Sequence, residues 1–299
     1  WRDNTGGYFW YQAPIETQAL MIELFGEMGN LSISTGSANN SEVDQMKTWL
    51  LKQKQTQSWP TSTATTEAIY ALLLKGTNWL QTIPAVRITA GNKTIDVAKA
   101  GDIKTEAGTG YFKTSWSGDE ITPAMGNITV TKASEGPGWG AMYFQYFENL
   151  DKIKAAESPL KISKQLFVKE NTSAGQRLIA ITAEKPLTIG DQVTVRVEIT
   201  SDRNLEFVHL KDMRASAFEP TSTLSGYNWK GGLGYYQSTR DAATNFFIYY
   251  LPKGTYVFEY QLVVSQAGEY SNGISTIQCM YAPEFAAHSE GIRFVVKEK

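Results

Sequence analysis

The first quarter of the chain has apolar residues at helical spacing. A first helix is predicted from one apolar face, formed by Ile15, Ala19, Ile22 and Phe25. Gly26 and Gly29 predict the end of that helix, because glycine readily takes the left-handed conformation that stops a helix. A second helix is predicted from Ser41, and a third, "TTEAIYALLLKG", ends at Gly76. Helices with one-sided apolar faces are typical of stacked helical hairpins, in which each hairpin covers its neighbour.

From about residue 84 the period of the apolar positions changes from 3.6 to 2, which indicates strands. Turn residues separate the short strands predicted here, at 86–89, 94–97, 111–116, 127–131 and 141–147. The polar segment "DKIKAAESP", residues 151–159, is interpreted as a linker. Beyond it, strand follows strand without a helix, and Tyr256, Phe258 and Tyr260 alternate with polar residues. This pattern predicts an antiparallel sandwich and places the whole chain in the multidomain α+β class.

Composition narrows the function without specifying it. The 299 residues suffice for two or three domains. The net charge is -2, and the chain has no block of basic residues of the kind that nucleic-acid-binding proteins carry. The chain begins at Trp1 with neither a basic leader nor an apolar signal core, so we expect a fragment of a longer protein. Its single cysteine, Cys279, cannot form an internal disulfide.

Catalytic chemistry is not indicated by any motif. Only two histidines occur, and we interpret His209 as a packed strand residue and His288 as a loop residue with a hydrogen-bonding role. The carboxylates lack the spacing of a zinc or calcium site, and Asp212 and Glu219 are interpreted as turn and cap residues. We therefore predict that the chain is not an enzyme, has no cofactor, binds no metal and binds no nucleic acid.

Five sequence segments in the last half of the chain occur in a characteristic order. They are Gly190-Asp191 before an alternating strand, "DMRASAFEP", a Leu-Pro-x-Gly-Thr hairpin, a Met-Tyr-x-Pro-Glu loop and a closing strand. In wording and order they resemble the final domain of the bacterial alpha-2-macroglobulin family, over roughly residues 160–299. The segment "GWGAMYFQYFENL" is similar to a strand of that family's CUB-like domain.

The resemblance implies a domain division and a fold. Residues 1–80 would be helical hairpins from the end of a thioester-type αα-toroid, 81–155 a CUB-like β domain and 156–299 a macroglobulin-like β-sandwich. The fold would be a short toroid remnant followed by two antiparallel β-sandwich domains. The resemblance also implies a bacterial cell-envelope location, periplasmic or anchored to the outer membrane by lipid outside this chain.

The resemblance further implies a part in binding or inhibiting proteases by entrapment, with proteases and other domains of the parent as partners. A family thioester joins a cysteine to a glutamine three residues later, but Ala282 stands at that distance from Cys279. The thioester would therefore lie elsewhere in the parent. Met280, Tyr281 and Pro283 match the loop that shields it, so they are candidate lid or interdomain residues; without a thioester they would pack an interface.

The segment "LSGYNWKGGLGYYQSTRD" is predicted to be an aromatic loop. Its candidate binding residues are Tyr227, Trp229, Tyr235 and Tyr236, which could contact a protein strand or a sugar ring. The alternative is a loop that packs its own aromatic rings. A glycan-binding or carbohydrate-processing accessory module is accordingly a rival function, although no opposed pair of carboxylates can be placed for hydrolysis. A purely structural scaffold is a third possibility.

Overall fold

The computed structural model describes residues 12–31, 38–75, 85–97, 103, 105–106, 110–134, 138–173, 175–182 and 185–298. The chain divides into two compact units. One contains residues 1–54 and 59–140, and the other contains residues 55–58 and 141–299. Among the helices described, none is both long and apolar enough to cross a membrane.

Helices α1 (Pro14–Leu31), α2 (Ala38–Thr56) and α3 (Ser62–Leu74) form in the region where the sequence predicts three helices. Their shared core comprises Ile15, Ala19, Ile22, Val43, Leu50, Ala64, Ala68 and Ala71. Helix α3 begins at an N-cap, because the Thr61 side chain accepts a hydrogen bond from the Ala64 amide at 2.9 Å. The small alanines on α3 let its backbone approach the other helices closely.

Two predicted helix boundaries are wrong, and a third lies outside the described residues. Helix α1 runs through Gly26 to Leu31, because Gly26 does not take the positive φ that ends a helix. Helix α2 begins at Ala38, three residues before Ser41. The predicted end at Gly76 is outside the described part of the chain; α3 itself ends at Leu74, and Lys75 is extended.

The described part of residues 81–155 contains one antiparallel sheet, with strand order β2-β1-β3. Its strands are β1 (Val86–Ala90), β2 (Lys93–Asp96) and β3 (Ile128–Lys132), and short 3-10 turns lie at Gly118–Glu120 and Pro123–Gly126. Gly91 turns the chain between β1 and β2 at φ +57°, and a Cβ there would lie 2.7 Å from the Ala124 carbonyl carbon. A glycine is therefore required at this position.

Two predicted strands, 111–116 and 141–147, are wrong: the structure describes these residues and they belong to no strand. The apolar side chains of the second segment are exposed, including Tyr146 and Phe147. Alternation alone does not make a strand, because a strand also needs a neighbouring edge to satisfy its backbone groups. No such edge pairs with either segment in the described residues.

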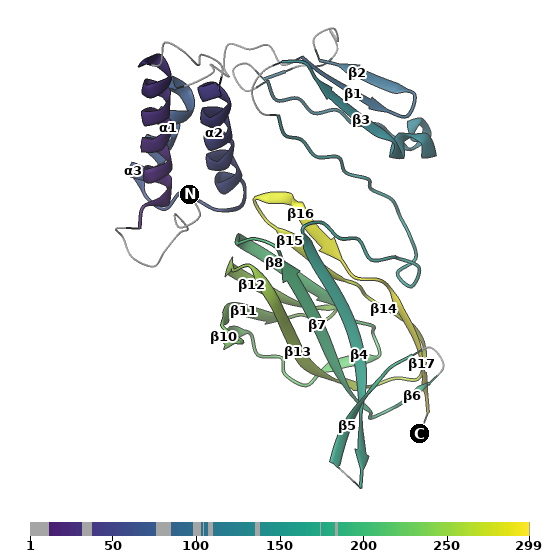
Figure 1. The fold of residues 1–299 in the computed structure, drawn as a ribbon. Coiled ribbons are helices and arrows are strands. Elements are labelled where there is room, and N and C mark those ends of the chain that lie inside the picture. The colour runs from purple at the N-terminus through teal and green to yellow at the C-terminus, as the bar shows by residue number, and fades with distance from the viewer. Residues whose placement is uncertain are drawn as a thin grey trace. The chain divides into compact units, whose positions relative to one another are not determined.

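The second unit is a β-sandwich (Figure 1). Its strands are β4 (Leu160–Thr172), β5 (Gly175–Ala180), β6 (Leu187–Thr188), β7 (Gln192–Ser201), β8 (Leu205–Met213), β9 (Phe218–Pro220), β10 (Gly226–Lys230), β11 (Leu233–Thr239), β12 (Ala243–Leu251), β13 (Gly254–Val264), β14 (Gly268–Asn272), β15 (Ser275–Cys279), β16 (Ala282–His288) and β17 (Ile292–Lys297). They form sheets of order β10-β11-β12-β8-β15-β16, β5-β4-β7-β13-β9 and β14-β17-β6. The pairing is antiparallel except between β17 and β6.

One hydrophobic core joins the two larger sheets. The five-stranded sheet contributes the alternating residues of β7, including Val195 and Val197, and the six-stranded sheet contributes Phe246 and Ile248 of β12. Each fully buried side chain of this size stabilises the fold by about 1.5–3 kcal/mol. His288, predicted in a loop, is instead the last residue of β16, and its backbone exchanges two hydrogen bonds with Ala156.

A buried ion pair crosses the core between the two larger sheets. Lys164 of β4 and Asp212 of β8 are both fully buried, with Nζ 2.5 Å from Oδ1. The Lys164 Nζ also donates to the carbonyl oxygens of Met213, at 2.5 Å, and Gly273, at 3.0 Å. All three N–H bonds of the ammonium therefore have an acceptor. Burial lowers the pKa of Lys164, and the Asp212 carboxylate opposes that shift.

The Asp212 carboxylate accepts two further hydrogen bonds. Ser275 of β15 donates its hydroxyl to Oδ1 at 2.7 Å, and the Tyr260 hydroxyl of β13 donates to Oδ2. Burial first, and the Asp212 charge second, raise the pKa of Tyr260 well above its usual value, so the phenol remains a neutral donor. The interpretation of Asp212 as a turn or cap residue is therefore wrong: it is the acceptor at the centre of a buried network.

Replacing Lys164 with methionine should strongly destabilise the sandwich. Lys164→Met leaves Asp212 buried without its cation, and breaking a buried pair in this way costs about 3–5 kcal/mol. Lys161→Met on the same strand is the control, because Lys161 is exposed and its ion pair with Glu157 lies at the surface; its effect should be under about 0.5 kcal/mol. Urea unfolding of the full chain measures both. Equal effects would contradict a stabilising role for the buried pair.

Candidate functional site

The two-residue turn between β15 and β16 carries the predicted lid residues. The side chains of Met280 and Tyr281 are 57% and 80% exposed, and Pro283, at the start of β16, is also exposed. The Met280 amide donates to the Phe207 carbonyl at 2.9 Å, which ties the turn to β8. The turn thus presents an aromatic ring and a thioether to the surface from a fixed backbone.

The cysteine before this turn is structural. Cys279 is buried, and its thiol donates to the Glu206 carbonyl at 3.2 Å. Burial raises the pKa of Cys279, so the sulfur stays a thiol. The register between β15 and β16 shifts between Gln278 and Cys279, and this irregularity places Met280 and Tyr281 at the tip.

The predicted aromatic loop is a β-hairpin, so that prediction is wrong. Strands β10 and β11 pair from Gly226↔Gln237 to Lys230↔Leu233, and the turn consists of Gly231 and Gly232 at φ +60° and +78°. Two consecutive positive φ values are those of the tightest hairpin turns, which glycine accommodates. The Gly-Gly pair between alternating aromatic residues is the sequence signal that could have identified the hairpin.

The four candidate residues of this hairpin divide between its two faces. Tyr227 and Trp229 are 87% and 79% exposed, and Tyr236 is half-buried with its ring 5.0 Å from that of Tyr227. Tyr235 is only 8% exposed and packs edge-on against Phe246 and Phe258. The prediction of Tyr235 as a binding residue is therefore wrong, because strand alternation directs it into the core.

The exposed hairpin residues and the turn lie on the same side of the six-stranded sheet. Residues paired directly across antiparallel strands share a face. The row Tyr227, Tyr236, Phe247, His209 and Gln278 runs in this way from β10 to β15. His209 stacks on Phe247 at 4.7 Å, and its Nε2 lies 3.0 Å from the Asn245 Oδ1.

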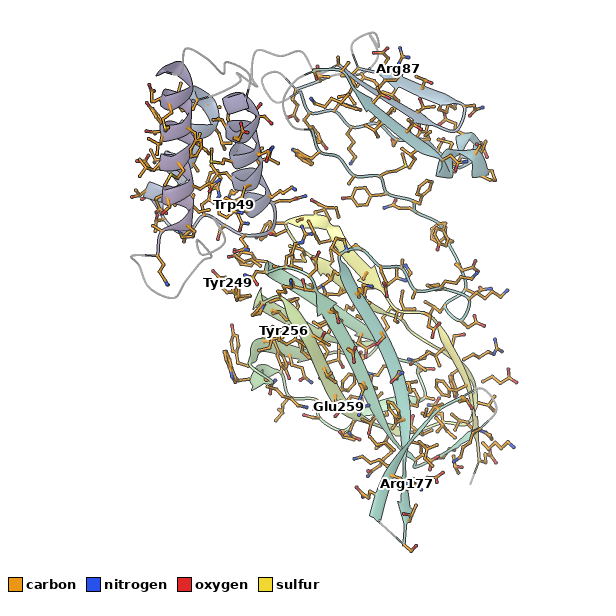
Figure 2. All side chains as sticks on the ribbon, in the orientation of Figure 1. Trp49, Arg87, Arg177, Tyr249, Tyr256 and Glu259 are labelled. Atoms are coloured by element: carbon orange, nitrogen blue, oxygen red, sulfur yellow. The ribbon has the colours of Figure 1, made fainter. Side chains whose placement is uncertain are left out.

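Two further aromatic contacts extend this row to the turn. Tyr249 is exposed on β12 (Figure 2), and its ring meets Phe207 edge-on at 5.0 Å. Phe207 meets Tyr281 edge-on at 5.1 Å. We call this surface the aromatic face; it comprises Phe207, His209, Tyr227, Trp229, Tyr236, Phe247, Tyr249, Met280 and Tyr281. Sequence analysis missed Phe207, Phe247 and Tyr249, although the alternation in "NFFIYYL" places Phe247 and Tyr249 on one side.

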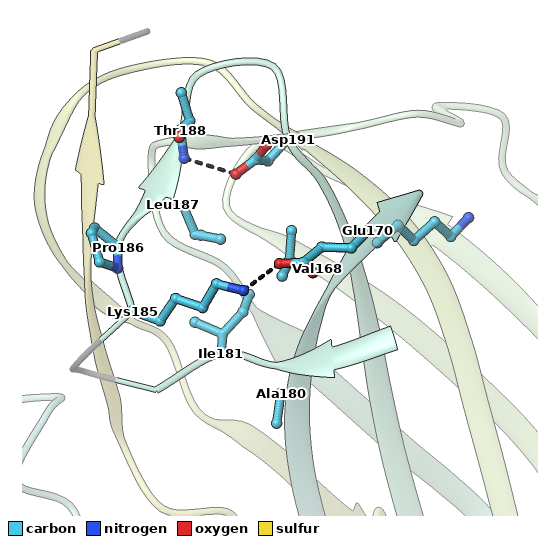
Figure 3. Close-up of a pocket in the computed structure, with 10 residues that line it drawn as sticks. Val168, Glu170, Ala180, Ile181, Lys185, Pro186, Leu187, Thr188 and Asp191 are labelled. Carbon is cyan, nitrogen blue, oxygen red and sulfur yellow. Dashed lines mark hydrogen bonds and ion pairs between the residues drawn. The ribbon is translucent and has the colours of Figure 1, made fainter. Parts of the chain in front are cut away.

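A small cleft lies at the other end of the sandwich, among β4, β5 and β6. Its volume is about 230 Å³, and Val168, Ile181 and Leu187 form its apolar wall. Lys185 pairs with Glu170 across it, and Asp191 accepts the Thr188 amide at 2.8 Å (Figure 3). The described residues hold no cluster of three metal-binding side chains, here or elsewhere. These polar groups satisfy one another, so the arrangement suggests no chemistry.

The second unit is a mainly antiparallel β-sandwich with an exposed aromatic face, and a comparison with protein families identifies its class. Residues 160–284 match the family model described as "Bacterial Alpha-2-macroglobulin MG10 domain". Residues 160–284 are therefore similar to the MG10 domain of bacterial alpha-2-macroglobulins. This confirms the family resemblance over residues 160–284. None of the curated proteins matches the chain.

Solved structures similar to this chain include two bacterial alpha-2-macroglobulins. Escherichia coli alpha-2-macroglobulin activated by porcine elastase is 13% identical with a TM-score of 0.44, over 95% of this chain and 24% of that chain. Salmonella alpha-2-macroglobulin reacted with methylamine is 15% identical with a TM-score of 0.39, over 98% of this chain and 18% of that chain. The chain thus spans a quarter or less of these proteins, and scores below 0.5 do not establish how its parts are arranged.

The neighbouring residues Tyr235 and Tyr236 should respond very differently to truncation. Tyr235→Ala removes a ring from the core and should cost about 3–5 kcal/mol, as truncation of a buried aromatic does. Tyr236→Ala, and likewise Tyr281→Ala at the turn, should cost about 1 kcal/mol or less. Chemical unfolding of each variant checks this. A loss of about 3 kcal/mol for Tyr281→Ala would show that this residue is part of the core and not a surface contact.

Proposed function

We propose that this chain is a non-catalytic part of a bacterial protein that inhibits proteases by entrapping them. The supporting observation is the MG10 match over residues 160–284, which includes the exposed Met280–Tyr281 turn. The Escherichia coli relatives are described as activated by elastase and by trypsin, so proteases are the proposed partners of the parent here too. Cleavage of a bait segment elsewhere in the parent would trigger a rearrangement of domains around the protease.

The proposed domains are helical hairpins over 1–80, a CUB-like β domain over 81–155 and a macroglobulin-like sandwich over 156–299. The helices support the first assignment because they expose a large apolar surface, formed by Leu20, Leu24, Met28, Ile69, Tyr70, Leu73 and Leu74. Soluble monomers rarely leave such a surface open, whereas further hairpins of an αα-toroid would cover it. The proposed location is the periplasm or the outer membrane.

The proposed role of Met280, Tyr281 and Pro283 is that of a lid or interdomain contact. An aromatic ring and a thioether make an apolar cover, which keeps water from a hydrolysable acyl group on a neighbouring domain. The buried Cys279, with Ala282 three residues later, supplies no thioester of its own. The lid would therefore act on a group contributed by another part of the parent.

Entrapment predicts a specific pattern of protease activity. After the full-length parent has been incubated with a protease, cleavage of a large protein substrate should fall at least about tenfold, whereas cleavage of a small peptide ester should persist. The physical reason is that entrapment restricts access to the protease without blocking its active site. Parallel assays with the two substrates measure this. Equal loss of both activities would indicate active-site inhibition, and no loss of either would refute the proposed function.

A second candidate function is glycan binding by the β10–β11 hairpin. Tyr227 and Trp229 favour it, because both rings are exposed and Trp229 lies over Gly234, where a Cβ would come within 2.7 Å of the indole. Aromatic rings held in this way can stack on sugar rings.

If glycan binding is correct, Trp229→Ala should abolish retention of the chain on insoluble peptidoglycan or chitin. The matched control is Tyr70→Ala, which removes an exposed ring from helix α3 and should leave retention unchanged. Co-sedimentation with each polymer measures both variants. Failure of the unaltered chain to co-sediment would rule out this function while leaving the proposal of protease entrapment intact.

A further inference from the structure

Phe207 has an unusual backbone conformation. Among the described residues it is the only one other than glycine with a positive φ, at +54°. A bulky side chain in the left-handed region meets steric resistance, and such residues persist only where the surrounding structure holds them. Phe207 lies within β8, where extended conformations are the rule. The conformation therefore indicates a local constraint.

The Phe207 carbonyl is a direct link between β8 and the β15–β16 turn. On either side of Phe207, β8 pairs regularly with β12, through Glu206↔Tyr250 and Val208↔Ile248. Phe207 itself is absent from this register, and its carbonyl accepts the Met280 amide at 2.9 Å. This bond continues the β8–β15 register, in which Cys279 lies opposite Val208, by one residue beyond the end of β15. The ladder thus ties the first residue of the turn to Phe207.

The ring of Phe207 acts on the same turn. It lies between two tyrosines and meets both edge-on, Tyr249 at 5.0 Å with the planes at 84° and Tyr281 at 5.1 Å with the planes at 88°. Edge-to-face contact is a favoured geometry for aromatic pairs. Because Tyr281 is 80% exposed, little else on the sandwich can hold its ring.

We propose that Phe207 is a positioning residue that sets the orientation of Tyr281 through two links, its left-handed carbonyl and its edge-on ring. Tyr249 holds Phe207 from the opposite side, so the three rings form one chain of contacts from β12 to the turn. The proposal deepens the lid function and rests on it for its biological meaning. The positioning itself is a property of this chain and can be tested without the parent.

The first test measures the turn directly in the full chain by NMR. Phe207→Gly accommodates the positive φ and so should fold and keep the carbonyl, but it removes the ring and loosens the backbone that holds the acceptor. The Met280 amide should therefore exchange with solvent roughly three- to tenfold faster. The Ile277 amide, in the buried middle of β15, is the internal reference and should change much less. The ring proton shifts of Tyr281 should move toward those of a free tyrosine.

Phe207→Tyr keeps the ring and should restore both signals. Phe247→Ala is the matched control, because it removes another exposed ring of the same face that stacks on His209 and not on the turn. If Phe207→Gly folds poorly, Tyr249→Ala tests the same chain of contacts from the other side. Unchanged exchange and ring shifts in Phe207→Gly, or in Tyr249→Ala where that variant is used, would overturn the proposal, as would equal changes in Phe247→Ala.

A second test, in the full-length parent, separates positioning from the lid function. If the lid function is correct, Phe207→Gly and Tyr281→Ala should each weaken protection of large substrates from the protease, and the double variant should be no worse than Tyr281→Ala alone. If Phe207→Gly loosens the turn in this chain but does not change protection in the parent, the lid function is refuted and the positioning role stands.

Discussion

The ion pair between Lys164 and Asp212 is the interaction on which the rest of the sandwich depends. Removing two charges from water is costly, and the cost is offset here because every N–H of the ammonium and both carboxylate oxygens have hydrogen-bond partners. Through Tyr260 and Ser275 the same carboxylate also contacts β13 and β15. Strands from both large sheets thus converge on one acceptor, and a displaced strand would leave a buried charge unpaired.

This constraint fixes the outside of the sheet as well as its interior. Side chains alternate along a strand, so a slip of one residue would exchange the two faces. Because Asp212 must point inward, β8 is held in a register that also determines its neighbour β12. Phe246 and Ile248 then fill the core, and Phe247 and Tyr249 face outward. The aromatic face is therefore a consequence of the polar network beneath it.

The sequence predicted the features that depend on local pattern. The three helices, the alternating strands β7 and β13 and the closing strand follow from apolar spacing, and the Met280–Tyr281 turn follows from a family motif. The failures concern long-range partners. The role of Asp212 depends on Lys164, which is distant in sequence, so the local pattern suggested only a turn residue. Residues 141–147 alternate as a strand does, but they pair with no neighbouring strand among the described residues. Tyr235 and Tyr236 are adjacent tyrosines, so only the register of β11 tells which one is buried.

The chemistry of the aromatic face favours binding over catalysis. Its one imidazole, His209, is stacked on Phe247 and lies within hydrogen-bonding distance of Asn245, so its position is fixed. The remaining members bind through area and shape, since aromatic rings offer large contact surfaces at low conformational cost. Exposed rings of this kind are suited to contact with another protein surface. The proposed positioning by Phe207 would favour such binding. A Tyr281 ring that is held in place before a partner arrives loses less conformational entropy when the partner docks.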